Sequence, residues 1–379
     1  MSRNISRRNF IASSSKISLL FPLLTKNLKA QVFGGLYEFY NDETTRVKIF
    51  RLVKGPSKNT TIYQTHPMWS PDMKAYYFLS DISTGEMQLH KLEIATGKII
   101  CLLENHIQAF SLCWNSENIY YIEDKEVIKR APNGSITKIA MLPNDVEANS
   151  GGIAITPDEQ WLYSGFQNKN GKWSLKRLYL KEPNWEECCE VDFQIGHVQT
   201  NPWDNSKVMF CWETGGDSPQ RTWYWNATTK KHQPFFLERD ELWVTHEVWW
   251  GKDSALFTVW PYDEKHKSLP HGVCYTTIEK GAKSEMDVLS LYPAWHTHGS
   301  HDLKWVLGDD FDRNIWLINP TRKEKRLLVR GKTGKNIKVH PHASFTPDGK
   351  GIVFNTSAFG MEEIHLVILP ENFESLPQI

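Results

Sequence analysis

Histidine is the residue type whose spacing in this sequence most clearly indicates chemistry. The chain has 379 residues, and 14 of them are histidine. His340-Pro341-His342 should project two imidazoles to one side of an extended strand, with proline stiffening the backbone between them. A third imidazole from an adjacent strand, His296 or His298, would complete a metal site. Imidazole binds Zn, Mn, Fe, Cu or Ni, so these residues predict a divalent metal without choosing it.

Other histidines recur at one position relative to an acidic turn residue. Counting back six or seven residues from that acid reaches a histidine in five units of the chain. A single such histidine is more often a structural, hydrogen-bonded residue, but five at one end of a common channel predict a functional site. The five are His66, His197, His246, His296 and His342. We expect His66 and His197 to bind substrate, together with Gln199 and His298.

A glycine-rich segment with charged side chains follows one of these histidines. It spans residues 211–223 and contains Gly215-Gly216 and Arg221. Adjacent glycines let a backbone approach a ligand closely, and Arg221 could bind a carboxylate through both arms of its guanidinium. A salt bridge from Arg221 to Glu213 or Asp217 is the structural alternative.

A repeated turn must position all of these residues. It has the form Ser/Thr-Pro-Asp or a degenerate version, and a strand-like apolar run follows each copy. Proline presets φ and aspartate hydrogen-bonds the following backbone, so each copy predicts a chain reversal.

Successive copies of this turn are 45, 41, 46, 49, 49 and 46 residues apart, which is the period of propeller blades. We therefore predict an all-β fold, a seven-bladed β-propeller forming a single domain over residues 31–379. A pair of β-sandwiches would not need this period. The acidic turn residues are Asp72, Glu117, Asp158, Asp204, Asp253, Asp302 and Asp348.

The first 30 residues are predicted to be an export signal rather than part of the fold. Ser6-Arg7-Arg8-Asn9-Phe10 is a twin-arginine pattern, and the mostly apolar stretch 11–24 follows it. With a cut after Ala30 the protein would be exported, to the periplasm or the cell exterior. A disordered basic tail is the alternative. Because the apolar stretch is too short to span a bilayer, we expect no stable membrane insertion after signal removal.

Charge and cysteine usage exclude several classes of protein. Residues 1–30 carry six of the 44 basic residues and no acid, which leaves 38 basic residues against 44 acidic ones. A broad nucleic-acid surface is therefore not expected. The six cysteines are scattered without metal-binding spacing, so they are predicted to be buried free thiols. The propeller of a serine peptidase would need a hydrolase domain and a Gly-x-Ser-x-Gly motif, which are absent from the sequence.

The sequence resembles the oligogalacturonate lyases, seven-bladed propellers that cut short pectic oligomers. The matching stretches extend over most of the chain after residue 30, and His340-Pro341-His342 with the following turn is the most specific of them. The stretches are residues 40–47, 66–72, 245–249, 296–309 and 340–348. A lyase on another uronate polymer, of the ulvan or rhamnogalacturonan type, and a non-enzymatic exported binding propeller are the alternatives.

The resemblance also implies a metal site. In that family a manganese ion is held by a histidine before a Gly-Asp run, by the two histidines of His-x-His and by a glutamine shortly before them. By position the histidines correspond to His296, His340 and His342. The glutamine is missing, since Ile337 stands three residues before His340. Either Asn336 or His298 takes the fourth place, or the site is weaker.

The reaction that the resemblance implies is β-elimination on an acidic oligosaccharide. A base removes the proton from C5 of a uronate, and the glycosidic oxygen at C4 leaves. A divalent metal, Mn²⁺ first, would bind the carboxylate and stabilise the developing enolate. The family's catalytic arginine corresponds to Arg221, which precedes Thr222-Trp223. Because guanidinium stays protonated at ordinary pH, the alternative is that His246 or His197 is the base and Arg221 binds a carboxylate.

Overall fold

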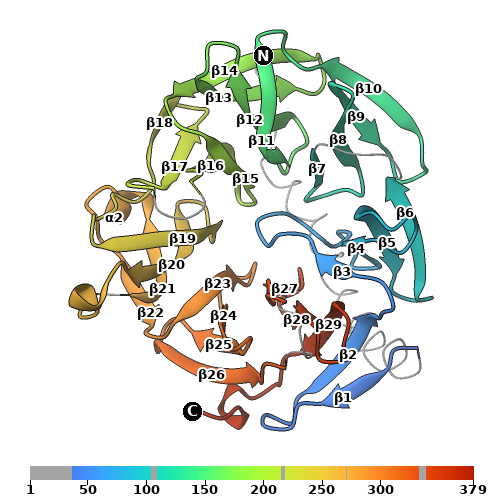
Figure 1. Cartoon of the computed structure of the whole chain (residues 1–379), viewed down its shortest axis with the longest axis vertical. Helices are drawn as coiled ribbons and strands as arrows, with labels where there is room; N and C mark the ends of the chain where they lie inside the picture. Colours follow the sequence, from blue (N-terminus) through green and yellow to red (C-terminus); the bar gives the residue numbers. More distant parts are fainter. Residues whose placement is uncertain (1–35, 104–108, 215–217, 270, 333–338) are drawn as a thin grey trace, which may run out of the picture.

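Seven antiparallel sheets form a ring in the computed structural model, which describes residues 36–103, 109–214, 218–269, 271–332 and 339–379 (Figure 1). Six of the sheets have four strands and one has five. The predicted all-β, seven-bladed, single-domain propeller is thus confirmed. The predicted export signal lies outside the described residues and stays a prediction. Among the described residues, no helix has the length and apolarity needed to cross a membrane.

Each four-stranded sheet is a meander of consecutive strands. The first contains β3 (Asn59–Thr61), β4 (Ala75–Ser80), β5 (Gln88–Glu93) and β6 (Lys98–Leu103). The second contains β7 (Ala109–Leu112), β8 (Ile119–Glu123), β9 (Glu126–Arg130) and β10 (Ile136–Met141). The third contains β11 (Val146–Ile155), β12 (Trp161–Asn168), β13 (Trp173–Tyr179) and β14 (Asn184–Val191).

The next three sheets follow the same order around the ring. The fourth contains β15 (Ile195–Asn201), β16 (Asp204–Trp212), β17 (Thr222–Asn226) and β18 (Lys231–Pro234). The fifth contains β19 (Leu242–Trp249), β20 (Ser254–Pro261), β21 (Gly272–Thr277) and β22 (Asp287–Ser290). The sixth contains β23 (Ala294–Gly299), β24 (Val306–Asp310), β25 (Ile315–Asn319) and β26 (Glu324–Val329). The short helices are η1 (Glu264–His266), α2 (Ile278–Gly281) and η2 (Phe373–Ser375).

The seventh sheet joins the two ends of the described chain. Its strands lie in the order β1 (Phe39–Asn41), β2 (Lys48–Val53), β29 (Glu363–Ile368), β28 (Gly351–Thr356) and β27 (Ser344–Phe345). The blue β2 therefore lies beside the red β29 and closes the ring (Figure 1). A closed ring leaves only short, protected sheet edges.

The predicted hydrogen bond between the turn aspartate and the following backbone is present in four copies, where the N–H two residues later donates to the carboxylate over 3.0 to 3.3 Å. A second bond, which was not predicted from the sequence, also orders these turns. In four copies a serine or threonine hydroxyl donates a hydrogen bond to the aspartate two residues later, over 2.6 to 2.8 Å. This bond orders the turn between the innermost strand of a blade and the next strand. The four pairs are Ser70–Asp72, Thr156–Asp158, Ser300–Asp302 and Thr346–Asp348.

The apolar core lies between neighbouring sheets rather than at the centre of the ring. Phe78 of β4 and Tyr121 of β8, for example, share one buried cluster across two blades. Burial of apolar surface between blades leaves the innermost strands free to carry polar residues. All six cysteines are free thiols, as predicted, and four of them are buried.

A buried ion pair fastens the closing sheet. Glu363 of β29 accepts two hydrogen bonds from Arg51 of β2, over 2.9 and 2.6 Å, and its Oε2 lies 3.0 Å from His365 Nε2. Burial alone would raise the pKa of Glu363, but the bonds from His365 and Arg51 lower it to about 2. Its ionised form therefore stabilises the folded state above its ordinary pKa of 4.5, and that contribution is lost as the pH falls toward 2.

Glu363→Gln is expected to lower the free energy of unfolding at neutral pH by about 2 kcal/mol, because it removes the buried carboxylate that both the half-buried Arg51 and the buried His365 contact. The difference from the parent protein should shrink as the pH is lowered from about 4.5 to 2. Urea denaturation followed across this pH range measures both. Glu38→Gln is the control, since Glu38 also contacts Arg51 at 2.7 Å but its side chain is 57% exposed, and it should cost under about 1 kcal/mol. Equal effects of the two variants would contradict this role of Glu363.

Candidate functional site

The innermost strands are irregular where the predicted histidines lie. His197, His246 and His342 have positive φ values of 48°, 55° and 41°. The pairing of β15 with β16 shifts register between Gly196 and Gln199, and that of β19 with β20 shifts between Thr245 and Val248. Such bulges change the direction in which side chains point. A left-handed backbone conformation is strained at a residue other than glycine, and strain of this kind clusters at functional sites.

Four histidines from four blades surround Tyr63. The Tyr63 ring centroid lies 5.2 Å from that of His197, 5.6 Å from His342 and 6.3 Å from His296. Its hydroxyl is 2.9 Å from His246 Nδ1. Sequence reasoning missed Tyr63, although it lies three residues before His66 in the innermost segment of its own blade. Burial, followed by the charge of Glu247, raises the pKa of Tyr63, so its hydroxyl stays protonated.

His296 is held in one orientation by an aspartate of the same blade. His296 Nδ1 lies 3.0 and 3.1 Å from the two carboxylate oxygens of Asp309 on β24, and the backbone N–H of His296 donates to the same group over 2.9 Å. Both side chains are buried. The carboxylate accepts the Nδ1 proton, so Nε2 presents a lone pair. This is the carboxylate–histidine arrangement that orients metal-ligating imidazoles.

The three histidines predicted to bind metal lie together. Ring centroids are 4.3 Å apart for His296 and His342, 5.9 Å for His296 and His340, and 6.2 Å for His340 and His342. With a metal–nitrogen distance of about 2.1 Å, imidazoles on one cation have centroids about 4.5 Å (cis) to about 6.4 Å (trans) apart. Burial, followed by proximity to His296, lowers the pKa of His340 and lowers that of His342 to about 3. Both rings are therefore neutral, which is the ligating form. Imidazole nitrogens suit a divalent cation, but the nearest ligand atoms of the three histidines do not all lie within 4.8 Å of one another, so at least one ring must turn for all three to bind one ion.

The fourth ligand is only partly accounted for. Asn336 lies outside the described residues. His298 does not join the three histidines, since its Nδ1 accepts a hydrogen bond from the backbone N–H of Phe345 over 3.3 Å. His246 lies beside the three histidines, with its ring centroid 4.3 Å from that of His296, and its Nε2 is buried without a partner among the described residues, which leaves that nitrogen available to accept a proton.

Arg221 is a buried cation. It lies directly before β17, and its Nε donates to Glu247 over 3.1 Å. Glu238 accepts the backbone N–H groups of Arg221 and Thr222, each over 2.8 Å, which anchors the loop. Burial lowers the pKa of Arg221, but the charges of Glu247, Cys211 and Glu213 together raise it above its ordinary value. The guanidinium therefore stays protonated.

Arg221 forms its ion pair with a carboxylate other than the two that the sequence suggested. The sequence suggested a salt bridge to Glu213 or Asp217, whereas the buried ion pair of Arg221 is with Glu247, the residue after His246. Glu213 lies 3.2 Å from His197 Nε2. Asp217 is outside the described residues.

His246 is a neutral imidazole between the arginine and the metal-binding histidines. Burial, then the proximity of His296 and Arg221, lowers its pKa well below 6.5. The ring also packs against Trp295, with centroids 4.7 Å apart. Arg221, His246 and the three histidines thus form one cluster, which could bind an anionic group and remove a proton beside it.

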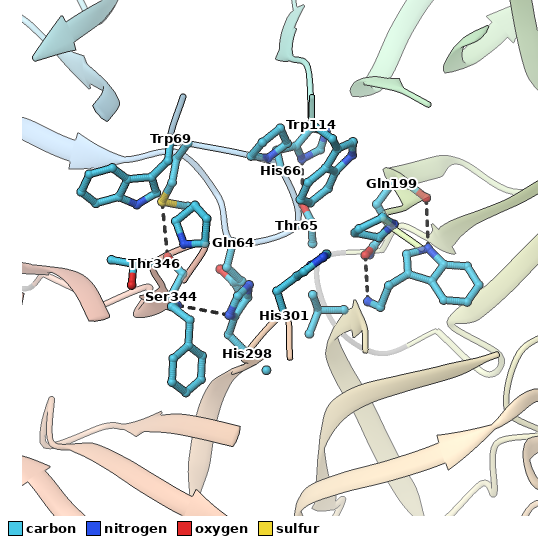
Figure 2. Close-up of a pocket in the computed structure, with 18 of the residues that line it drawn as sticks. Gln64, Thr65, His66, Trp69, Trp114, Gln199, His298, His301, Ser344 and Thr346 are labelled. Carbon is cyan, nitrogen blue, oxygen red and sulfur yellow. Dashed lines mark hydrogen bonds between the residues drawn. The ribbon is translucent and has the colours of Figure 1, made fainter. Parts of the chain in front are cut away.

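Three of the residues expected to bind substrate line a separate cavity of about 290 Å³ (Figure 2). They are His66, Gln199 and His298; of the four, only His197 lies in the cluster around Tyr63. The described residues that line this cavity include neither Arg221 nor His246, and they include no Asp, Glu, Lys or Arg. An uncharged lining does not favour an anionic substrate.

His66 departs from the expectation that five imidazoles converge. A turn brings its backbone N–H to the carbonyl of Tyr63, so the innermost segment is not extended there. His66 Nε2 lies 3.0 Å from the carbonyl of Ile153 and Nδ1 lies 2.9 Å from the Thr65 hydroxyl. Burial lowers the pKa of His66 to about 4. With both ring nitrogens engaged, His66 has the contacts of a structural histidine.

Known proteins of similar sequence and fold include oligogalacturonate lyases. No family model matches the chain. It is 25% identical over 344 residues to an oligogalacturonate lyase of Dickeya dadantii, covering 78% of this chain and 84% of that protein. It resembles an oligogalacturonate lyase structure from Vibrio parahaemolyticus with a TM-score of 0.76 and 19% identity, and the match covers 88% of this chain and 97% of that one. It also resembles an oligogalacturonate lyase solved in complex with manganese with a TM-score of 0.77 and 19% identity, and that match covers 88% of this chain and 96% of the other. The resemblance to oligogalacturonate lyases is therefore confirmed in sequence and in fold.

Proposed function

We propose that this protein is an oligogalacturonide lyase that cleaves short pectic fragments by metal-assisted β-elimination, yielding unsaturated uronates. The observation that carries the proposal is the cluster in which the buried Arg221 and His296 lie with the half-buried His246, His340 and His342. The named activity of the Dickeya dadantii relative and the manganese in a structural neighbour support the same class.

The first requirement of the reaction is neutralisation of the uronate carboxylate, since the C5 proton is otherwise too weakly acidic. His296, His340 and His342 would hold a divalent metal, with Mn²⁺ the first candidate, and the metal when bound would supply Lewis-acid stabilisation at that carboxylate. Arg221 adds a permanent positive charge in the same cluster, fixed by Glu247. A preorganised cation in a water-poor site stabilises developing charge more than it would in water.

The second requirement is a base. We propose that His246 takes the C5 proton at Nε2 and that Arg221 binds a carboxylate. His246 is neutral and its Nε2 has no partner among the described residues. In this role the Nδ1–H donates to the Tyr63 oxygen, over 2.9 Å, and Nε2 keeps the lone pair that accepts the proton. Arg221 would be the base only if its proton were lost, and the raised pKa of Arg221 opposes that loss. This reverses the order that the family resemblance suggested.

An ultraviolet assay tests the function. Purified protein is mixed with di- and trigalacturonate after treatment with a chelator, and again with added Mn²⁺, while the absorbance of the conjugated unsaturated uronate is followed. An increase that the chelator abolishes and Mn²⁺ restores supports the proposal. If folded, metal-loaded protein produces no increase on pectic oligomers, the oligogalacturonide assignment is wrong, and oligomers of ulvan and rhamnogalacturonan are the next substrates to assay.

A further inference from the structure

A second set of metal-ligand side chains lies beside Arg221. His197, Cys211 and Glu213 bring one ligand atom each to within 4.8 Å of one another, and they are the only three or more such residues in the described part of the chain to do so. His197 Nε2 lies 3.2 Å from Glu213 Oε2, and Cys211 Sγ lies 3.6 Å from the same oxygen. None of the three is among the histidines assigned above to the manganese site.

The two separations from Glu213 match a tetrahedral ion site, and the His197 and Cys211 ligand atoms lie within 4.8 Å of each other. With metal distances of about 2.3 Å to sulfur and about 2.05 Å to nitrogen and oxygen, tetrahedral ligands stand about 3.4 Å (N to O) and about 3.6 Å (S to O) apart. The side chains therefore need little movement to close on an ion. Three protein ligands would leave a fourth position for water.

The backbone is shaped to bring these three side chains together. Cys211 pairs across the sheet with Gly196, and the bulge that follows Gly196 holds His197 at positive φ. A Cβ on Gly196 would lie 2.8 Å from Glu213 Cβ, 2.9 Å from Glu213 Oε2 and 3.1 Å from Cys211 Sγ. Any larger residue would therefore displace two of the three ligands.

Burial and charge are compatible with a bound cation. Cys211 is fully buried, whereas the side chains of His197 and Glu213 are 31% and 24% exposed, so an ion can reach the group from solvent. The nearby charge of Arg221 is paired with Glu247. A thiolate and a carboxylate balance the two charges of a divalent ion. Burial raises the pKa of the Cys211 thiol, so an ion that binds displaces the thiol proton.

We propose that His197, Cys211 and Glu213 form a second cation site, selective for thiophilic divalent ions of the Zn²⁺ class. Thiolate ligation favours Zn²⁺ and Co²⁺ over Mn²⁺, which prefers oxygen and imidazole, so the two sites sort different metals. The proposal is independent of the lyase assignment, because it concerns ion binding only.

Co²⁺ reports thiolate ligation directly. Titrating the chelator-treated protein with Co²⁺ should produce a sulfur-to-metal charge-transfer band in the near ultraviolet, and Cys211→Ser should abolish it. Cys274→Ser is the matched control, because Cys274 is an equally buried thiol of a neighbouring blade and its loss should leave the band intact. Glu213→Gln keeps the thiol, so the band should remain, with Co²⁺ affinity reduced about tenfold or more.

Equilibrium dialysis against Zn²⁺ supplies the stoichiometry. We expect Cys211→Ser to bind one Zn²⁺ per chain fewer than the parent protein, with the thermal unfolding of each variant measured to establish that it is folded. A parent protein that shows no charge-transfer band at saturating Co²⁺, a band that survives Cys211→Ser, or a loss of Zn²⁺ equal in the Cys274→Ser control would overturn the proposal.

Discussion

His296→Ala is expected to abolish Mn²⁺ binding and elimination together. Among the three predicted ligands, His296 is the one whose Nδ1 is fixed by a buried carboxylate, and the His340 and His342 rings both contact it. Removing it leaves two partly exposed imidazoles. Loss of about 4 kcal/mol of Lewis-acid stabilisation corresponds to a rate decrease of about 10³-fold. The measurements are Mn²⁺ content after dialysis and the rate of formation of unsaturated product.

Asp309→Asn tests the same site with a milder change. Asparagine keeps the shape but offers one acceptor oxygen, so the His296 ring loses its ionic partner, and we expect Mn²⁺ affinity to fall by about 10–100-fold. His298→Ala is the control, because His298 lines the separate cavity and should leave Mn²⁺ affinity unchanged. Normal Mn²⁺ binding in a folded His296→Ala variant would show that the metal is held elsewhere.

Blade number could be predicted from the sequence because its cause is local. A serine or threonine and an aspartate two residues apart form the same turn wherever they occur, as Ser70–Asp72 and Thr346–Asp348 illustrate. Closure of the ring was not predicted, since the pairing of β2 with β29 depends on contacts between residues more than 300 positions apart. A local sequence pattern does not encode pairing between residues that lie so far apart along the chain.

The proximity of the three histidines could be predicted from the sequence, whereas their role as metal ligands stays a prediction. His296, His340 and His342 lie near one another because they occur in the innermost segments of two adjacent blades. Strand alternation, however, fails where the backbone bulges or turns. The turn at His66 places Tyr63 at the level of the histidines and sends His66 to the separate cavity.

The ion-pair partner of Arg221 could not be predicted from the sequence either. Arg221 and Glu247 are 26 positions apart and meet only because two neighbouring blades face the same channel. Glu213 was an equally plausible partner from sequence, being closer along the chain. The carboxylates of Glu247 and Glu213 both raise the pKa of Arg221, and His246 is neutral, so the choice between arginine and histidine as base needed the structure.

Replacing His246 and Arg221 in two separate variants tests which of these residues is the base. His246→Asn removes a proton acceptor but preserves most of the volume, so we expect kcat to fall by about 10²–10⁴-fold with little change in KM. Arg221→Lys keeps the charge but loses the planar fork that can hold a carboxylate. We expect it to raise KM and to lower kcat/KM by about 10²-fold, while leaving measurable turnover.

The opposite ranking would contradict this mechanism. If Arg221→Lys is inactive while His246→Asn keeps kcat within about tenfold of the parent protein, Arg221 is the base and its proton must be lost when metal and substrate bind. Arg239→Lys is the control for arginine replacement in general, because Arg239 pairs with Glu241 at the surface. Mn²⁺ content should be equal in all variants. With the metal retained, a fall in kcat alone identifies proton transfer as the step that His246 performs, since a residue that only binds carboxylate also changes KM.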